Sequence, residues 1–395
     1  MKNTYRKMNC FDLTVITGLE CFAIKECRNK LNFEQIEYRN GHVYLTTDND
    51  FEKLLKLKSV DHIHAVLFDD EIPELSFIDA SKFVKIFTDI IQKCDWKNGI
   101  RVWAQAHQFY NKENINLQQQ KEVLDRISDE SFFKPTFRVS CNRNGKHNFE
   151  SPRVASEFGC LLNDHFFWKV DLTNYQLKIQ LTVHNTRFLV AIQLTREPLF
   201  KRFIVNFGRT TLRGTIAYAL LQIAEPKLGD IVCDSLCGSG VIPIEAADDW
   251  PGILSLGSDY HKKAIEKTLS NFQANPLPNL NILQLDTTRM PYRDNSIDCF
   301  VTDLPFGRRM GSKTLNQKLY PALLSEMLRV CRLETGRIVW LTQDRRNANS
   351  CFSKESPLKQ YFIVVKCIFV KIGGLDASIY HLHRNNKEFA TQKIY

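Results

Sequence analysis

The sequence predicts a chain of mixed class, with an α+β N-terminal half and an α/β C-terminal half. In the first half, Leu177, Ile179, Leu181 and Val183 alternate with polar residues, which is the period of a half-buried strand in an antiparallel sheet. From residue 231 onward, short apolar runs alternate with helical patterns, and the runs end in a glycine turn or an acidic residue. This order is typical of a parallel sheet with a ligand at its carboxyl edge. A length of 395 residues fits roughly two or three domains.

The elements of the first half form a small mixed module. We expect a strand at residues 136–140, a helix at 154–162 and two strands at 177–183 and 187–194, the last two joined by a turn at His184-Asn185. Strands and helices in this order indicate an α+β unit. Residues 10 to about 78 are only weakly patterned, so the first boundary is poorly defined by the sequence.

The C-terminal half opens with a strand at 231–234, a loop of small residues and a helix at 241–247. Gly238 and Gly240 let the backbone approach a ligand without an intervening side chain. The third glycine of the dinucleotide fingerprint and the Gly-Lys-Ser/Thr of a phosphate-binding loop are both missing, which disfavours hydride and phosphoryl transfer. An ordinary strand-to-helix turn is the alternative interpretation.

Three further strands, at 253–258, 280–285 and 297–302, each end in an aspartate. We expect Asp259 to accept hydrogen bonds from both hydroxyls of a ribose, Asp286 to meet an adenine amine, and Asp303 to lie beside them. Each aspartate can instead be the N-cap of a following helix. Their joint occurrence at successive strand ends favours a nucleoside site.

Asp303-Leu304-Pro305-Phe306 places a carboxylate, a rigid turn and an aromatic ring side by side. The lone pair of an exocyclic base amine is conjugated into the ring, and acceptors for both amine hydrogens would release it. We expect the carboxylate of Asp303 and the carbonyl of Leu304 to be those acceptors, Pro305 to fix the turn and Phe306 to stack on the base. In a paired stem the base would have to flip out. A simple turn is the alternative.

The remaining strands and helix complete the sheet. Residues 317–330 form an amphipathic helix with Leu319, Leu323, Leu324, Met327 and Val330 inward. Residues 337–341 form a strand, and 362–370 and 377–382 form a terminal pair. We expect the apolar residues Ile363, Val365 and Ile368 to be buried on both faces.

Two basic segments are candidates for contact with phosphates. The first, residues 196–213, contains the basic residues Arg196, Lys201, Arg202, Arg209 and Arg213, with phenylalanines between them. The second contains Arg308, Arg309 and Lys313, directly after the aromatic turn. A formal net charge of +9 favours an anionic partner such as nucleic acid. Solvated surface is the alternative for each segment, and for residues 196–213 a structural role is favoured over contact with nucleic acid.

Composition excludes several other classes. The 12 cysteines form no Cys-x-x-Cys pair, so metal ribbons are disfavoured and no metal is expected. Scattered cysteines fit a reduced, intracellular protein, which we expect in the cytoplasm and also allow in the nucleus. No segment approaches the roughly 20 apolar residues of a membrane helix, and the N-terminus lacks an apolar signal core.

Together these motifs resemble a known family. Asp234-x-x-Cys237-Gly238-Ser239-Gly240, the acidic strand ends and the 303–306 turn are similar to Rossmann-fold S-adenosylmethionine-dependent methyltransferases. Residues 207–213, 303–313, 341–344 and 372–375 more narrowly resemble the THUMP-domain-containing tRNA guanine-N2 methyltransferases. The commoner amino-methyltransferase motif is Asn/Asp-Pro-Pro-Tyr/Phe, and Leu304 here replaces its first proline as it does in that subgroup.

The resemblance implies a domain order and a set of ligands. It implies a ferredoxin-like domain at 1–78, an RNA-binding THUMP domain at 79–195 that docks the acceptor end of tRNA, and a methyltransferase domain at 196–395, with a linker at 196–213 and a mostly parallel seven-stranded sheet. It also implies S-adenosylmethionine held by Thr211, Arg213, Asp234, Cys237, Gly238, Gly240, Asp259, Asp286 and Asp303. RNA contacts are expected from Lys201, Arg202, Arg209, Arg308, Arg309 and Lys313.

The implied partners are tRNA and a small zinc-containing activator that covers an exposed edge of the methyltransferase sheet. Other substrates stay open, because the four-residue turn does not name the base. N2 methylation of another structured RNA such as an snRNA or rRNA, and N6 methylation of adenine, both fit it. An RNA-binding protein with a vestigial cofactor pocket is a third alternative.

Overall fold

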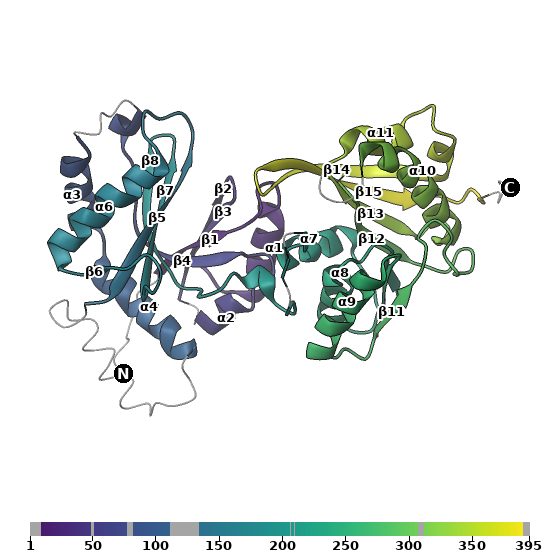
Figure 1. Cartoon of the computed structure of the whole chain (residues 1–395), viewed down its shortest axis with the longest axis horizontal. Coiled ribbons are helices and arrows are strands. Elements are labelled where there is room, and N and C mark those ends of the chain that lie inside the picture. The colour runs from purple at the N-terminus through teal and green to yellow at the C-terminus, as the bar shows by residue number, and fades with distance from the viewer. Residues whose placement is uncertain are drawn as a thin grey trace. The chain divides into compact units, whose positions relative to one another are not determined.

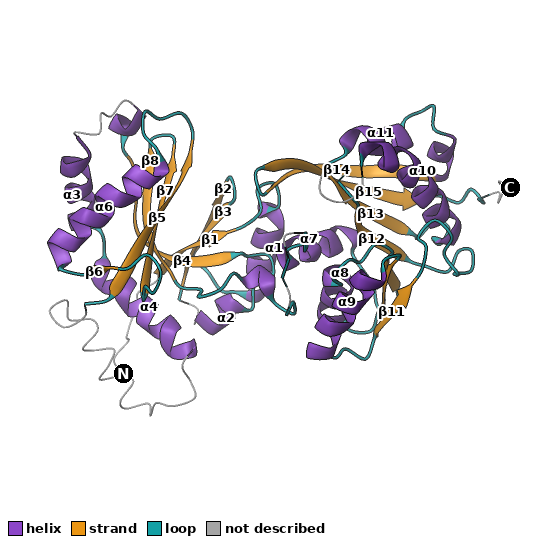
Figure 2. Ribbon diagram, in the orientation of Figure 1, coloured by secondary structure: helices purple, strands orange, loops and turns teal. Residues whose placement is uncertain are grey.

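The computed structural model describes residues 9–48, 51–76, 82–110, 134–205, 207–208, 210–306 and 312–389, with only the backbone described for 108–110 and 313. The chain divides into two compact units (Figures 1 and 2). The first consists of Met1–Thr14 and Ile24–Pro198, and the second of Val15–Ala23 and Leu199–Tyr395.

The first unit is built on one sheet of eight strands, in the order β2-β3-β1-β4-β8-β7-β5-β6. Its elements are β1 (Asn9–Thr14), α1 (Glu20–Lys30), β2 (Gln35–Arg39), β3 (His42–Thr47), α2 (Phe51–Leu55), β4 (His62–Glu71), η1 (Pro73–Ser76), α3 (Phe83–Lys93), α4 (Trp96–Tyr110), β5 (Thr136–Asn144), α6 (Ser151–Phe166), β6 (Lys169–Val170), β7 (Leu177–His184) and β8 (Arg187–Gln193). The strands and the helix predicted between residues 136 and 194 are confirmed, and each lies within about two to four residues of its predicted ends.

The sheet of the first unit is continuous across the two N-terminal domains that the resemblance implies. β4 pairs antiparallel with β8, from His64 opposite Gln193 to Glu71 opposite Arg187. The pairing of β5 with β7 is parallel. The weakly patterned N-terminal segment therefore supplies half of a sheet whose other half comes from residues 136–193.

Aromatic side chains fill the core under one face of this sheet. Phe87 of α3 lies 5.5 Å from the ring of Phe158 of α6 and 5.5 Å from that of Phe188 of β8. Phe83 stacks on Phe87 at 5.0 Å. All four rings are fully buried. The helices α3 and α6 therefore cover one face of β5, β7 and β8 (Figure 1).

The second unit is a doubly wound sheet of seven strands, in the order β11-β10-β9-β12-β13-β15-β14. Its elements are η3 (Leu199–Lys201), α7 (Gly214–Ala224), β9 (Ile231–Asp234), α8 (Val241–Asp249), β10 (Leu254–Asp259), α9 (Lys262–Ala274), β11 (Leu280–Gln284), β12 (Cys299–Asp303), α10 (Lys313–Val330), β13 (Arg337–Thr342), α11 (Arg345–Phe352), η4 (Pro357–Tyr361), β14 (Phe362–Ile372) and β15 (Leu375–Arg384). The strands from β11 to β13 are parallel, and β15 runs antiparallel to both β13 and β14. The mostly parallel seven-stranded sheet predicted from the sequence is confirmed.

Helices cover both faces of this sheet, as Figure 2 shows for α8 and α9 on one side and α10 and α11 on the other. Every residue of β13 is buried. Val339 and Leu341 enter the core formed with α7 and α8, whereas Ile338 and Trp340 enter the core formed with α10 and α11. A strand buried on both faces needs this near-continuous apolar sequence.

The prediction that β14 is buried on both faces is wrong. Ile363, Val365 and Phe369 are 60%, 51% and 61% exposed. β14 is the edge strand of the sheet, and its pairing with β15 is irregular between Val364 and Lys366. Phe362 packs into the core formed with α10 and α11, and Val370 into the core formed with α7 and α8. The apolar side chains of Ile363, Val365 and Phe369 between them stay in solvent.

The described residues bear on three features of the sequence: membrane helices, metal sites and cysteines. No helix there is both long and apolar enough to cross a membrane. No group of three or more His, Cys, Asp or Glu side chains in these ranges is placed to hold a metal ion. All the cysteines lie in described segments, and they are free thiols.

Candidate cofactor and catalytic site

Three aspartates meet at the carboxyl edge of the parallel sheet in the second unit. Asp234, Asp259 and Asp303 are the last residues of β9, β10 and β12, and β9 pairs with both of the other strands. Burial raises the pKa of Asp234 well above its usual value, and the charges of Asp303 and Asp259 add to the rise. Burial also raises the pKa of Asp303 to about 7. Asp234 and Asp259 accept hydrogen bonds from backbone N–H groups, whereas Oδ1 of Asp303 has no hydrogen-bond partner among the described residues.

The loop after β9 has room for a Cβ atom at Gly238 and none at Gly240. Gly238 has a φ of +57°, and a Cβ built there would meet no atom within 4 Å. Gly240 has a φ of +82°, and a Cβ there would lie 2.5 Å from Cγ2 of Thr268. Gly238 thus borders open space, whereas Gly240 is required by the packing of α9. The predicted cofactor role for Gly240 is better explained as a structural one.

Asp259 holds the glycine loop in place. Its Oδ2 accepts a hydrogen bond from the backbone N–H of Gly238 at 3.1 Å, and its Oδ1 accepts one from that of His261 at 2.9 Å. Carboxylate oxygens have further lone pairs, so both contacts leave capacity for ligand hydroxyls. Asp259 therefore couples the loop to the end of β10.

The side chains of two other predicted cofactor residues, Cys237 and Asp286, are engaged by neighbouring residues of the protein. Cys237 is buried, with its Sγ 3.7 Å from the hydroxyl of Thr268, so only its backbone can face a ligand. Asp286 is exposed, and its Oδ1 accepts hydrogen bonds from the backbone N–H and the hydroxyl of Thr288 at 2.8 and 2.7 Å. Asp286 lies directly after β11, two strands from β9, where the sequence placed it.

The turn after β12 is fixed by a buried polar network. The N–H of Leu304 donates to the carbonyl of Leu341 at 2.9 Å. The carbonyl of Pro305 accepts hydrogen bonds from Nδ2 of Asn316 and from the hydroxyl of Tyr320, both at 2.8 Å. With these two donors in place, the turn is anchored to α10.

The same network reaches the end of β13. The hydroxyl groups of Tyr320 and Thr342 are 2.8 Å apart, and Nδ2 of Asn316 donates to Oδ2 of Asp344 at 3.0 Å. Asn316, Tyr320 and Thr342 are fully buried. Sequence reasoning missed Asn316 and Tyr320, although their spacing of four residues on an amphipathic helix puts both on its inward face.

Phe306 is half-buried and packs against the core formed with α7 and α8. Arg308 and Arg309 lie outside the described residues. Lys313 begins α10, and its side chain is likewise outside the described part.

Arg202, which was also expected to contact RNA, is engaged in the basic connector by a buried glutamate. Nη2 and Nε of Arg202 donate to Glu245 at 2.7 and 3.1 Å, and the Glu245 side chain is only 1% exposed. A guanidinium held by a buried carboxylate favours a structural role over RNA contact. Lys201 is exposed at the end of η3, and Arg209 lies outside the described residues.

Thr211 and Arg213 precede α7. The Thr211 hydroxyl accepts a hydrogen bond from the N–H of Gly208 at 3.0 Å, which closes a local turn. Arg213 is the N-cap residue of α7, and its guanidinium lies 4.6 Å from the ring centre of Phe200. Both residues shape the entry to α7, and their predicted contact with a cofactor stays a prediction.

The site fits S-adenosylmethionine on the chemistry of its donor set. Oδ1 of Asp303 and the hydroxyls of Ser235 and Ser258 are shielded from solvent and have no hydrogen-bond partner among the described residues. A ligand with an ammonium, a sulfonium and ribose hydroxyls supplies the positive charge and the donors that buried carboxylates require. The open space beside Gly238 lies at the same edge of the sheet.

Comparison with protein families matches both halves of the chain. The RMKL-like methyltransferase domain family (UPF0020) matches residues 202–376, and the THUMP domain family matches residues 115–193. The first match contains the glycine loop, the three strand-end aspartates and the 303–306 turn.

Solved structures share the fold. The crystal structure of TrmN from Thermus thermophilus has a TM-score of 0.74 at 21% identity, and covers 96% of this chain and all of that one. The crystal structure of SMU.472 in complex with SAH has a TM-score of 0.67 at 16% identity, and the match covers 96% of this chain and 99% of that one.

Curated relatives extend along nearly the whole chain. The tRNA (guanine(6)-N(2))-methyltransferase THUMP3 of Homo sapiens is 33% identical over 95% of this chain and 88% of its own length. The U6 snRNA (guanine-N(2))-methyltransferase THUMPD2 of Homo sapiens is 26% identical over 88% of this chain and 81% of its own length. On the extent and identity of the first of these matches, the chain belongs to the family of THUMP-domain-containing, S-adenosylmethionine-dependent tRNA (guanine-N2)-methyltransferases.

Proposed function

We propose that this enzyme transfers a methyl group from S-adenosylmethionine to N2 of a guanosine in the acceptor-stem region of tRNA, and forms N2-methylguanosine there. The observation that carries the proposal is the turn at 303–306. The half-buried carboxylate of Asp303 has one oxygen without a hydrogen-bond partner among the described residues. The turn that follows it is anchored to α10 through the carbonyl of Pro305. The names of the tRNA methyltransferase relatives, which specify guanine 6, support the same substrate.

In this mechanism the protein chiefly positions the amine. When bound, S-adenosylmethionine supplies an activated methyl group on its sulfonium. The carboxylate of Asp303 and the carbonyl of Leu304 accept hydrogen bonds from the two hydrogens of guanine N2, which frees the nitrogen lone pair for attack in line with the methyl group. Phe306 stacks on the base, and base–aromatic stacking contributes about 1–3 kcal/mol.

Asp303 also takes the proton that N2 must lose after methyl transfer. A pKa raised to about 7 by burial places the carboxyl group near the operating pH, which is where a general base is most effective. Asn316 and Tyr320 do not touch the base. They hold the carbonyl of Pro305, and so they fix the direction of the neighbouring Leu304 carbonyl.

The tRNA substrate is favoured over U6 snRNA by the degree of similarity. The mouse tRNA methyltransferase THUMP3 is 34% identical over 95% of this chain, compared with 26% over 88% for the human U6 snRNA methyltransferase THUMPD2. Both groups are guanine-N2 methyltransferases by name, so the acceptor atom is shared and only the RNA differs.

We also propose a small zinc-containing activator as a second subunit that covers an edge of the methyltransferase sheet. Each edge strand exposes apolar side chains, with Leu283 at 41% on β11 and Val365 at 51% on β14. Exposed apolar edges are sites where another chain adds to a sheet. Leu283→Lys and Val365→Lys, each tested for co-purification with the activator, distinguish the two edges, and retention by both variants would contradict the placement.

We propose a cytoplasmic location, with the nucleus as a second site. The support is chemical, because free cysteines such as the exposed Cys21, Cys160 and Cys367 suit a reducing compartment. Fractionation of cells that express a tagged chain at native level would test this, and a signal confined to an oxidising compartment would contradict it.

Transfer of labelled methyl from S-adenosylmethionine to bulk tRNA, followed by nucleoside analysis, tests the function. We expect label in N2-methylguanosine, with more transfer when the activator is present. Label in N6-methyladenosine would overturn the base assignment. Absence of label in tRNA together with label in U6 snRNA would overturn the substrate.

A further inference from the structure

Gln343 is a polar residue beside the turn at 303–306 whose side chain is not engaged by the protein. It is half-buried and follows directly after β13. Its amide makes no hydrogen bond to any of the described residues. The residues on both sides of it are engaged, because Oγ1 of Thr342 lies 2.8 Å from the hydroxyl of Tyr320 and Oδ2 of Asp344 accepts from Nδ2 of Asn347 at 2.8 Å. Gln343 therefore has donors and an acceptor to spare.

The alternation of β13 places Gln343 on the same face of the sheet as Phe306. Trp340 enters the core formed with α10 and α11, whereas Leu341 enters the core formed with α7 and α8. Gln343 comes two positions after Leu341 and so shares its face. Phe306 packs against that same core. The amide and the aromatic ring thus belong to one side of the carboxyl edge.

Asp303 lies on this face as well. Val301 enters the core formed with α7 and α8, and Asp303 follows it by two positions in β12. Asp303 is the parallel partner of Leu341, so Gln343 lies on the neighbouring strand, two residues further along. With strands about 4.8 Å apart and a rise of about 3.3 Å per residue, the Cα atoms of Asp303 and Gln343 are roughly 8 Å apart. At this separation the two side chains can contact neighbouring groups on the edge of one purine.

We propose that Gln343 selects guanine as the methylated base, by pairing with the groups next to its N2 amine. On the edge of guanine, N2, N1–H and O6 follow one another, so a base held at N2 by Asp303 presents the other two groups beside it. Oε1 of Gln343 accepts from N1–H, and Nε2 donates to O6. Such two-point contacts of a carboxamide with a base edge discriminate between bases.

Adenine does not satisfy the same amide. If the adenine amine lay against Asp303, the next groups on its edge would be the acceptor N1 and a C–H, so only one contact with Gln343 could form. Gln343 is thereby a specificity-determining residue, which takes no part in methyl or proton transfer. The inference rests on the proposed function, because it takes the amine at Asp303 to be N2 of guanosine.

The test uses 2-aminopurine, which keeps the N2 amine but lacks O6 and the hydrogen on N1. Two tRNA transcripts carry either guanosine or 2-aminopurine at the methylated position, and the ratio of their kcat/KM values is measured for each protein. The two amines differ in reactivity, but this difference is the same for every protein and cancels when the ratios are compared. Gln343→Met keeps the length of the side chain and removes the amide. Gln343→Ala keeps the inference testable if the methionine folds poorly.

We expect wild type to prefer guanosine, and both variants to lose at least about fivefold of that preference, which corresponds to one neutral hydrogen bond. The KM for S-adenosylmethionine should not change. Gln360→Met is the matched control in the second unit, because its Nε2 donates to the carbonyl of Pro357 at 3.0 Å.

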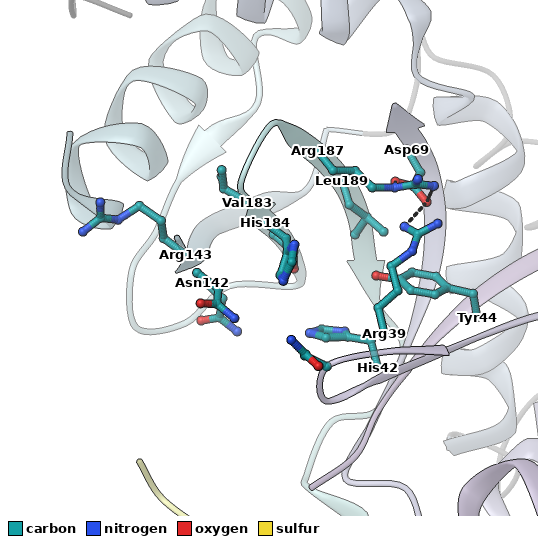
Figure 3. A pocket seen from close by; sticks show the side chains of 13 residues that line it. Arg39, His42, Tyr44, Asp69, Asn142, Arg143, Val183, His184, Arg187 and Leu189 are labelled. Carbon is teal, nitrogen blue, oxygen red and sulfur yellow. Dashed lines mark hydrogen bonds and ion pairs between the residues drawn. The ribbon is translucent and has the colours of Figure 1, made fainter. Parts of the chain in front are cut away.

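A second control lies in the first unit. Asn142→Ala removes a carboxamide from the lining of a cavity of about 150 Å³, in which Arg187 and Asp69 form an ion pair (Figure 3). Any change in tRNA affinity there acts on both transcripts alike, so the ratio should keep its wild-type value.

Three results would overturn the inference. An unchanged ratio in Gln343→Met and Gln343→Ala would show that the amide does not contact N1 or O6. Equal loss of activity on both transcripts would indicate a general role in positioning. A raised KM for S-adenosylmethionine with an unchanged ratio would assign Gln343 to the cofactor. Failure of the proposed function looks different, because the wild-type chain would then methylate neither transcript.

Discussion

The hydroxyl of Tyr320 donates a hydrogen bond of 2.8 Å to the carbonyl oxygen of Pro305 and lies 2.8 Å from the hydroxyl of Thr342. Tyr320 therefore links the turn at residues 303–306, where we propose that the target base binds, to the neighbouring strand β13. Because the Pro305 carbonyl is held by α10, the Leu304 carbonyl keeps one direction relative to Asp303.

Tyr320→Phe should lower kcat without changing the KM for S-adenosylmethionine. Removal of the hydroxyl loses a buried hydrogen bond worth about 0.5–1.5 kcal/mol of folding free energy, and it loosens the turn. Steady-state kinetics and urea denaturation measure the two effects. Tyr380→Phe is the matched control, because its hydroxyl donates to Asn349 at 2.8 Å, away from the turn. A kcat equal to wild type in Tyr320→Phe would show that the network does not position the base.

Asp303→Asn should abolish methyl transfer and stabilise the fold. The pKa of Asp303 in the folded chain is about 7, compared with an ordinary value of 3.8, so the charged form opposes folding. The loss of folding free energy caused by the charged carboxylate is absent below about pH 4 and grows between pH 4 and 7. Above pH 7 it reaches up to about 4 kcal/mol. Denaturation of both proteins at pH 4 and pH 8 checks this, and a gain of similar size at both pH values would contradict it.

Activity should rise with pH through the titration of Asp303. The carboxylate is the form that accepts from N2, and burial raises its pKa to about 7. We expect kcat/KM to increase from pH 5.5 to about 8 with an inflection near 7, since this parameter reports the free enzyme. A profile flat across that range would mean that Asp303 is already ionised at pH 5.5, or that its charge is irrelevant to the reaction.

Gly238→Val and Gly240→Ala should fail in different ways. In Gly238→Val the new side chain enters open space, so the chain should fold, at a cost of about 1–2 kcal/mol because the residue keeps a left-handed backbone conformation. The variant should bind S-adenosylmethionine about tenfold more weakly or worse, a change of ~1.4 kcal/mol in binding free energy. Gly240→Ala should destabilise the fold, because its Cβ meets Cγ2 of Thr268 at 2.5 Å. Adding Thr268→Ser removes that methyl group and should recover part of the stability.

Calorimetric titration with the cofactor and thermal unfolding separate these effects. Normal cofactor affinity in Gly238→Val would show that the loop does not border the cofactor. A Gly240→Ala chain as stable as wild type would show that α9 tolerates the extra atom.

Arg202→Gln should lower stability much more than tRNA affinity. The Glu245 side chain is 1% exposed and accepts from Arg202, and removing one partner of a buried pair costs about 3–5 kcal/mol. The double variant Arg202→Gln with Glu245→Gln should restore most of that loss. Lys201→Gln, at the exposed neighbouring position, is the control for charge. If Arg202→Gln lowers tRNA affinity and the double variant does not restore it, Arg202 contacts RNA and the structural role is contradicted.

The sequence predicted the methyltransferase half well because its signals are local. Asp234, Asp259 and Asp303 each end an apolar run, and parallel strands place their carboxyl ends at one edge. The glycine loop was equally visible, although the sequence does not separate Gly238, which borders space, from Gly240, which packs on Thr268.

Features that depend on distant pairing were not predictable. Glu245 looks like an ordinary helical glutamate, and its link to Arg202 spans 43 residues. The hydrogen bonds from Asn316 and Tyr320 to Pro305 require α10 to be placed first. Exposure of Val365 follows from the edge position of β14, which composition alone does not reveal.

The most direct measurement is methyl transfer to two tRNA transcripts that differ at one nucleotide. One carries guanosine at position 6, the position named for the relatives of this chain, and the other carries inosine, which lacks only the N2 amine. We predict transfer to the first transcript and none to the second, with label recovered as N2-methylguanosine. Equal transfer to both would show that the amine of that guanosine is not the acceptor.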